Sequence, residues 1–354
     1  MKALRLICLA AVTLVAVSCG VSRPAAQSQT QPQGQAESQP QSSEVVVPQY
    51  LQKGDKIAII APAYTTPFEN VLGAAEIIRS WGYEPVIGTN VGCLEGGKYA
   101  GTPKERAADL VSALENPDIK AIICTRGGYG TIHLIELLRP ELFAANPKWL
   151  VGYSDITTLL EMATCAGVAS IHGTMGNTIA KGGEDISCQT LKGLLEGTVP
   201  QYELPAHPQN IQGKATGILV GGNICTFAPN IGTWADAGSK EDLILFIEEV
   251  GEAMHNVDRQ FNILRANGVL DRCKGVILGQ FTGCDSEFDY GSVEEMLNIY
   301  LKDYDIPVLC GFPAGHGEPN LPLATGASAT IDVRADGATV SFNIPGTQKV
   351  VDLR

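Results

Sequence analysis

The sequence predicts an α/β protein in two parts, with a parallel β-sheet in the first half and a β-rich second half. In the first half, apolar runs that do not alternate with polar residues are each followed by a helical pattern. A stretch rich in Pro, Gly and Gln at 191–212 weakens this rhythm, and two alternating segments flank a turn near the end. Continuous apolar strands are typical of a parallel sheet covered on both faces, and alternating strands of a half-exposed antiparallel hairpin.

The first half repeats one unit, a short apolar strand followed by a helix. The run KIAIIA at Lys56–Ala61 has almost no polar face, which predicts a strand buried on both sides. The predicted strands are Lys56–Ala61, Pro85–Gly88, Ile119–Cys124 and Trp149–Tyr153, and the predicted helices are Glu69–Trp81, Lys104–Glu115, Ile132–Leu138 and Ile156–Ala166.

We place the domain boundary after residue 205, in the stretch that contains Pro200, Pro205 and Pro208. The N-terminal domain then covers 45–205 and the C-terminal domain 206–354. For the second half we expect strands at Ala215–Val220, Leu243–Ile247, Gly275–Gly279 and Val308–Gly311, helices near Asn256–Ala266 and Val293–Leu301, and a hairpin of Ala327–Val333 with Ala338–Ile344.

The N-terminus has the features of an export signal. Lys2 and Arg5 precede the apolar run Ile7–Val17, which is too short to span a bilayer as a permanent helix. Residues 1–18 are therefore predicted to be a signal peptide. The following Cys19 has two interpretations, a lipidated N-terminal cysteine or the flank of an ordinary signal cleavage site. We favour lipidation, which would anchor the exported protein to a membrane of the bacterial cell envelope, on the periplasmic side.

The segment after the signal, 19–44, is predicted to be a disordered linker, because it consists mainly of Gln, Ser, Pro and Ala. The formal net charge of the 354-residue chain is −13, which argues against a protein that binds nucleic acid. Beyond the first 19 residues, eight cysteines are spread without a CxxC pair, and we expect mostly buried free thiols rather than a disulfide framework.

The most specific local motif is Gly152-Tyr-Ser-Asp155, between a predicted strand and a predicted helix. This placement predicts that Ser154 lies in a tight strand-to-helix turn, where the helix N-terminus could stabilise an oxyanion. The motif differs from Gly-x-Ser-x-Gly, since Ile156 occupies the last glycine position. Taken alone, the motif favours the simpler interpretation, in which Ser154 serves only as a helix cap.

Two other segments could contribute to a site at the carboxyl ends of the strands. Arg126-Gly-Gly-Tyr-Gly130 follows the strand that ends at Cys124, and its backbone N–H groups could approach a ligand closely. His172 and His316 both lie in glycine-containing loops after apolar runs, and Glu248, at the end of the run Leu243–Ile247, is the best-placed carboxylate. A serine nucleophile requires such a base and a carboxylate to orient it.

Together these segments resemble one family, the L,D-carboxypeptidases and microcin-self-immunity proteins. The resemblance covers nearly all of Val46–Arg354. It rests on IAIIAPA near the N-terminus of the fold, Thr125–Gly130, Gly152–Asp155, His172-Gly173, Gly221–Asn223, Leu245–Glu249 with Val257–Arg259, and Gly311–Gly317.

The resemblance implies a Rossmann-like N-terminal domain, a smaller β-rich C-terminal domain, and a site between them. It further implies a Ser–Glu–His triad in which Ser154 is the nucleophile, His316 the general base and acid, and Glu248 its orienter. Glu249 stands where the family commonly has Asp, so the neighbouring glutamate is an alternative. Backbone N–H groups of Gly127 and Asp155 would bind the oxyanion, and no metal or organic cofactor is required.

The reaction implied by the resemblance removes the terminal D-alanine from a muramyl tetrapeptide, and members often form homodimers. Peptidoglycan-recycling members are typically cytoplasmic, whereas this chain has a predicted export signal, so its substrate could be wall peptides outside the inner membrane. A peptide-antibiotic conjugate is an alternative amide substrate. A simple esterase is an alternative function within the enzyme class. A solute-binding lipoprotein without catalysis is the competing class.

Overall fold

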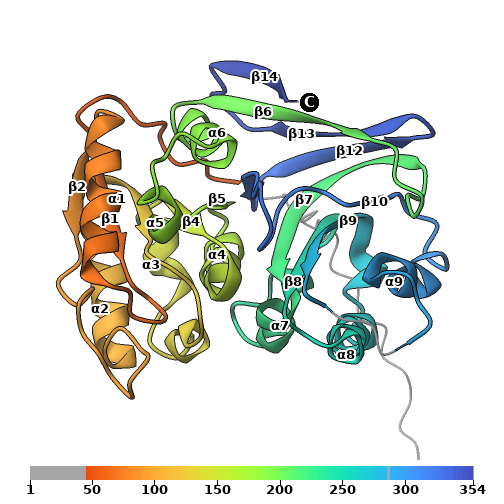
Figure 1. Ribbon diagram of the computed structural model, residues 1–354, viewed down its shortest axis with the longest axis horizontal. Coiled ribbons are helices and arrows are strands. Elements are labelled where there is room, and N and C mark those ends of the chain that lie inside the picture. Colours follow the sequence, from red (N-terminus) through yellow and green to blue (C-terminus); the bar gives the residue numbers. More distant parts are fainter. Residues whose placement is uncertain (1–44, 285–287, 354) are drawn as a thin grey trace, which may run out of the picture. The chain divides into compact units, whose positions relative to one another are not determined.

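The computed structural model describes residues 45–284 and 288–353. The predicted signal peptide, Cys19 and the linker to residue 44 lie outside these residues. The described chain contains two β-sheets with helices packed against them (Figure 1). None of its helices is both long enough and apolar enough to cross a membrane. The eight cysteines of the described residues are free thiols, four of them buried and four half-buried, in agreement with the sequence prediction.

The first sheet has six strands in the order β11-β5-β4-β3-β1-β2, and all neighbours are parallel except β11. Its strands are β1 Lys56–Ile60, β2 Glu84–Ile87, β3 Ile119–Cys124, β4 Trp149–Gly152, β5 Ser170–His172 and β11 Leu323–Thr325. Its helices are α1 Phe68–Ser80, α2 Pro103–Glu115, α3 Pro140–Ala145, α4 Thr157–Cys165, α5 Gly176–Ile179 and α6 Ile186–Leu195, with 3-10 turns η1 Thr131–Leu134 and η2 Ser154–Ile156.

The continuous apolar strands are explained by packing on both faces of this sheet. Along β1, Ile57 and Ile59 pack in one core with helices α1 and α6, while Ala58 and Ile60 pack in another with α2 and α4. All four side chains are at most 2% exposed. Since neighbouring residues of a strand point to opposite faces, both faces must be apolar, as the sequence predicted.

The second sheet has eight strands in the order β10-β9-β8-β7-β12-β13-β6-β14. Strands β7 to β10 run parallel, and β12 and β13 form the predicted hairpin, with Arg334 paired to Gly337 across its turn. The strands are β6 Thr198–Pro205, β7 Gly213–Asn223, β8 Leu243–Val250, β9 Cys273–Thr282, β10 Val308–Cys310, β12 Ser328–Arg334, β13 Gly337–Asn343 and β14 Lys349–Leu353. Its helices are α7 Ile224–Phe227, α8 Met254–Ala266 and α9 Val293–Leu301, with 3-10 turns η3 Ala228–Asn230, η4 Ala237–Ser239 and η5 Leu270–Arg272.

The predicted α/β fold, with a parallel first sheet and a β-rich second part, is confirmed. The two sheets exchange strands, however. Strand β6, which precedes residue 206, pairs with β13 and β14 of the second sheet, and β11 from the C-terminal half pairs with β5 of the first. The boundary after residue 205 stays a prediction.

The predicted helix Ile132–Leu138 is wrong in extent. The chain instead forms the 3-10 turn η1, and a separate helix α3 begins at Pro140. Proline disfavours helical backbone in the residue before it, and Arg139 is accordingly extended, with φ −139° and ψ 148°. One continuous helix through this segment is therefore not formed.

Candidate active site

Ser154 lies in a strained turn between β4 and the helical residues that follow. Its φ is 62°, a left-handed conformation that is uncommon for residues other than glycine and that occurs often at functional sites. Gly152 permits the turn, because a Cβ there would lie 2.6 Å from the Ile156 side chain. No side-chain cap is present at η2 or α4, so Ser154 is not acting as a helix cap. The predicted strand-to-helix turn is confirmed.

Gly127 brings the backbone after β3 against this turn. A Cβ at Gly127 would lie 2.8 Å from Ser154 Cβ, 2.9 Å from Ser154 Oγ and 3.1 Å from the backbone nitrogen of Asp155. Only glycine fits at this approach without displacing Ser154. The three residues that the family resemblance implies as nucleophile and oxyanion donors therefore lie close together.

The Asp155 side chain stabilises the turn from the buried side. Its Oδ2 accepts a hydrogen bond from the Thr131 backbone N–H at 3.0 Å, and the Thr131 hydroxyl donates to the Asp155 carbonyl at 2.5 Å. Burial raises the pKa of Asp155, while the bonds from Thr131 and the charge of Arg106 oppose that rise. Arg106, only 1% exposed, donates to the carbonyl oxygens of Pro62 at 2.6 Å and Gly130 at 2.8 Å. The loop that contains Gly127 is thus fixed to its neighbours by buried hydrogen bonds.

Glu248 and His316 form the second part of the site. Glu248 Oε2 lies 2.7 Å from His316 Nδ1, and their side chains are 0% and 16% exposed. Burial raises the pKa of the Glu248 carboxyl, and the hydrogen bond with His316 opposes that rise. Two glycines make room for the carboxylate, since a Cβ at Gly315 would lie 2.9 Å from Glu248 Oε2 and one at Gly279 would lie 3.2 Å from Glu248 Cβ.

Glu249 does not contact His316. Its Oε1 accepts hydrogen bonds from Asn223 Nδ2 at 2.9 Å and from the Val250 N–H at 2.8 Å, and its Oε2 accepts one from the Cys225 N–H at 3.1 Å. Because adjacent residues of a strand point to opposite faces, only one of the two glutamates can face the histidine. Of the two, Glu248 is the one in position to orient His316.

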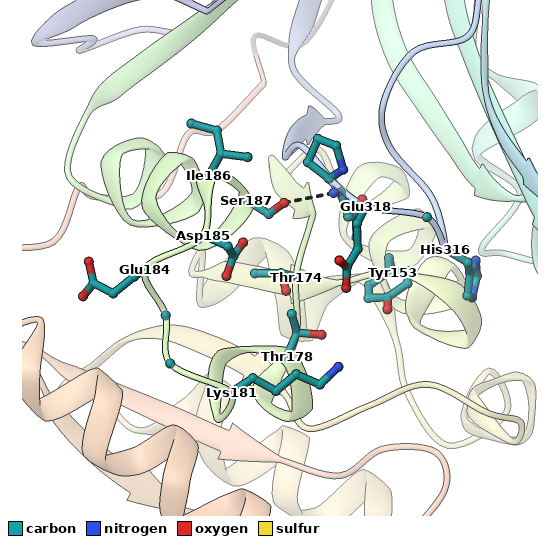
Figure 2. A pocket seen from close by; sticks show the side chains of 15 residues that line it. Tyr153, Thr174, Thr178, Lys181, Glu184, Asp185, Ile186, Ser187, His316 and Glu318 are labelled. Carbon is teal, nitrogen blue, oxygen red and sulfur yellow. Dashed lines mark hydrogen bonds between the residues drawn. The ribbon is translucent and has the colours of Figure 1, made fainter.

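The loop that carries His316 is braced on both sides. Gln280 accepts a hydrogen bond from the Gly317 N–H at 2.8 Å and donates to the Pro319 carbonyl at 3.1 Å. Asn320 accepts from the Gly315 N–H at 3.1 Å, and its own N–H donates to Ser187 Oγ at 2.9 Å (Figure 2). These side chains restrict the loop before any ligand is bound.

The two parts of the site meet at Tyr153, which packs edge-on against His316 with 5.0 Å between the ring centroids. Within the described residues no hydrogen bond joins Ser154 to His316; such contacts are often long without substrate and tighten when it binds. His172 lies behind both rings, fully buried, and burial together with the nearby His316 lowers its pKa to about 3. Its ring packs edge-on against Phe246, with 4.9 Å between the ring centroids.

A cavity of about 710 Å³ opens beside His316 and Tyr153 (Figure 2). One wall is the segment from Thr178 to Ser187 and the other is the loop from His316 to Asn320. Sequence reasoning missed this cavity and the charged residues Lys181 and Glu318 within it. It also missed Gln280 and Arg106, because their roles depend on contacts between distant segments.

Comparison with known proteins identifies the family. The N-terminal domain of LD-carboxypeptidases matches residues 57–173, and the C-terminal domain of the same family matches 216–331. A putative carboxypeptidase of Synechocystis is 35% identical over 300 residues, which cover 83% of this chain and 96% of that protein. The microcin C7 self-immunity protein of Escherichia coli is 28% identical over 338 residues, covering 84% of this chain and 96% of that protein.

The solved structures agree with this assignment. The crystal structure of muramoyltetrapeptide carboxypeptidase from Oxalobacter formigenes matches with a TM-score of 0.74 and 27% identity, covering 82% of this chain and 99% of that one. The family resemblance and the two-part fold expected from the sequence are both confirmed. The protein described here is a hydrolase of the LD-carboxypeptidase family.

Proposed function

We propose that this protein is a serine carboxypeptidase that removes the terminal D-alanine from muramyl tetrapeptides. The observation that carries the proposal is the 2.7 Å contact between Glu248 and His316 beside the turn that strains Ser154 to a φ of 62°. A buried carboxylate that orients a partly exposed imidazole is the arrangement needed to activate a serine hydroxyl. A solute-binding protein has no need of it.

In the acylation step, His316 Nε2 removes the proton from Ser154 Oγ as that oxygen attacks the scissile carbonyl carbon. Glu248 holds the Nδ1 proton and stabilises the imidazolium that forms. The negative charge on the carbonyl oxygen is met by the N–H groups of Gly127 and Asp155. His316 then gives its proton to the departing nitrogen, the C–N bond breaks, and D-alanine leaves.

In the deacylation step, water takes the place of the departed amine. His316 removes a proton from that water, whose oxygen attacks the ester carbon attached to Ser154. The second tetrahedral intermediate collapses, and His316 returns the proton to Ser154 Oγ. The products are a shortened peptide with a new carboxylate and the free enzyme.

The choice of a cell-wall peptide follows the names of similar proteins, among them the muramoyltetrapeptide carboxypeptidase of known structure. The similarity to a microcin C7 self-immunity protein favours a second candidate, an amide bond in a peptide-antibiotic conjugate. Both reactions use the same acyl-transfer chemistry, so the site geometry is compatible with either. The two similarities cover nearly the same share of this chain, 82% and 84%, so coverage does not favour one substrate over the other.

For cellular location we propose export and attachment to a membrane through lipidated Cys19. The support is the charged and apolar signal pattern that precedes Cys19 and the polar linker that follows it. A homodimer likewise stays a prediction. Mass spectrometry of the mature N-terminus tests the attachment: a lipid on Cys19 that C19S lacks is expected, and an unmodified mature N-terminus contradicts it.

The reaction is tested with a panel of substrates. The purified protein is incubated with muramyl tetrapeptide ending in D-alanine, the same peptide ending in L-alanine, a peptide–nucleotide conjugate, and an aryl ester. Release of D-alanine from the first, at least about tenfold faster than L-alanine from the second, is expected. Cleavage of the conjugate alone selects the second candidate, preference for the ester indicates an esterase, and cleavage of none contradicts the proposal.

A further inference from the structure

Lys181 is the one cationic residue among the charged side chains that line the cavity beside His316; the others are Glu184, Asp185 and Glu318. It follows helix α5 and is exposed. In Figure 2 its side chain extends along the cavity toward the side where Tyr153 and His316 lie. No ion pair within the described residues occupies its ammonium group. An unpaired cation in the cavity next to the proposed base is therefore free to bind an anion.

Within the described residues, none of the three acidic side chains that line the cavity forms an ion pair with Lys181. Asp185 caps helix α6, where its Oδ1 accepts a hydrogen bond from the Cys188 N–H at 3.0 Å. Figure 2 shows Glu184 pointing away from the other side chains of the cavity, and Glu318 on the opposite wall. The wall that carries Lys181 also carries Glu184 and Asp185, and Glu318 lies opposite, so among these four side chains Lys181 is the one that can attract an anion.

An enzyme that removes only a terminal residue must recognise the free carboxylate of that residue. In the proposed reaction this carboxylate lies two bonds from the departing nitrogen, which His316 protonates. The carboxylate must therefore enter the space next to His316, and the cavity that His316 lines offers such a space. We propose that Lys181 binds the terminal carboxylate of the substrate and so restricts the enzyme to removal of the last residue. This assignment rests on the proposed function and adds a specificity residue to it.

A second cation near Ser154 provides the competing assignment. Arg126 precedes Gly127, its guanidinium lies 5.8 Å from the centre of the Tyr64 ring, and its Nε is buried without a hydrogen-bond partner among the described residues. Arg126 does not line the cavity, whereas Lys181 does. Arg126 is therefore the alternative cation for the terminal carboxylate, and R126Q is measured beside K181Q to decide between the two.

The test compares two substrates that differ only at the terminus, muramyl tetrapeptide with a free carboxylate and the same peptide with a terminal carboxamide. Four variants of the full chain are measured beside the wild type: K181Q, K181R, R126Q and K192Q. Lys192 serves as the matched control, since it pairs with Glu196 at 3.3 Å and does not line the cavity. Thermal midpoints confirm that each variant is folded.

The wild type is expected to prefer the carboxylate substrate. K181Q should lower kcat/KM for that substrate by about ten- to a hundredfold, mainly through KM, because a charge-assisted hydrogen bond is lost. The same change should alter kcat/KM for the carboxamide by less than about twofold, so the preference disappears. K181R should retain most of the preference, and K192Q all of it. A structural role for Lys181 would instead slow both substrates equally.

Several results overturn the assignment. The role of Lys181 is excluded if the wild type does not prefer the carboxylate substrate over the carboxamide, or if K181Q keeps that preference. It is also excluded if K181Q slows both substrates equally, or if R126Q removes the preference and K181Q does not. Cleavage of neither peptide by the wild type overturns the proposed function itself, and the role of Lys181 with it. Cleavage with an unchanged preference in K181Q overturns only the role of Lys181.

Discussion

Glu248 Oε2 and His316 Nδ1 lie 2.7 Å apart, although one residue lies near the carboxyl end of strand β8 and the other belongs to the loop after β10. The parallel pairing of β9 with both β8 and β10 brings the carboxyl ends of these strands to one edge of the sheet. The same edge faces the turn of Ser154, through the contact of Tyr153 with His316. The site thus combines one residue from the first sheet with two from the second.

The neighbouring glutamates provide the first prediction. Glu248→Gln should lower kcat by about 10²- to 10⁴-fold with little change in KM, because an amide cannot stabilise the imidazolium that forms on His316. Glu249→Gln should reduce kcat far less. It should instead lower the free energy of unfolding by about 1–3 kcal/mol, since a single amide oxygen cannot accept all three of its hydrogen bonds.

Steady-state kinetics and urea denaturation of the two variants, measured in parallel, check this prediction. The assignment of Glu248 is contradicted by the reverse pattern, with catalysis lost in E249Q and retained in E248Q.

The contact of Gly127 with Ser154 gives a steric prediction. Gly127→Ala would place a methyl group 2.9 Å from Ser154 Oγ and should lower kcat by about a hundredfold through displacement of the nucleophile. Gly193→Ala is the matched control, because a Cβ at this helical position meets only ordinary contacts at 3.6 Å or more. Its activity should be unchanged and its stability higher by about 0.4–1 kcal/mol. Equal activity of the two variants would show that Gly127 does not support Ser154.

The brace on the His316 loop can be removed without changing a charge. Gln280→Met deletes the hydrogen bonds to Gly317 and Pro319 while keeping a similar volume. We expect kcat to fall roughly tenfold because His316 is held less firmly. Gln201→Met is the control, since it removes only an exposed bond to Asp352 at 3.2 Å. Comparable kcat values for Q280M and the wild type would mean that other contacts suffice to hold the loop.

Glu161 predicts a pH dependence of stability that is separate from catalysis. This carboxyl on helix α4 is buried, Asn230 donates a hydrogen bond to it, and burial raises its pKa well above the usual value. The folded state therefore holds the proton more tightly than the unfolded state. The stabilisation is fully present below a pH of about 4.5, the unfolded pKa, and is lost as pH rises through the folded pKa.

Glu161→Gln imitates the protonated form and should remove this dependence. Its free energy of unfolding, relative to the wild type, should increase with pH above about 4.5, by up to about 1.4 kcal/mol per pH unit. Urea denaturation at a series of pH values measures the difference. A difference that stays constant with pH would show that Glu161 has the same pKa in both states.

Four of the six strands of the first sheet, β1 to β4, could be predicted because each satisfies a local rule. The apolar runs at β1, β3 and β4 are buried on both faces of the sheet. A strand with one face in water would expose every second apolar side chain of such a run. Helix α6 was missed since it adjoins the Pro- and Gly-containing stretch, although its buried face includes Leu191 and Leu194. Strand β11 could not be anticipated, because three residues with a partner about 150 positions away give no periodic pattern.

For the site, the turn of Ser154 was predictable because strand, glycine and helix are adjacent in the sequence. The choice between Glu248 and Glu249 was not, since it depends on which face of β8 meets the His316 loop. The register of the two strands shifts at this point. Between the pairs Ile247–Leu278 and Glu249–Phe281, β8 has one residue, Glu248, whereas β9 has two. Lys181 and Gln280 were missed for the same reason: their importance comes from segments that only the fold brings together.

The most direct measurement is the rate of D-alanine release from muramyl tetrapeptide by the wild type and by Ser154→Ala, with substrate affinity determined for the variant by calorimetry. The account predicts that kcat falls by at least about 10⁴-fold while the dissociation constant stays within a few-fold of the wild-type KM. Release by the variant within about tenfold of the wild-type rate would contradict Ser154 as the nucleophile.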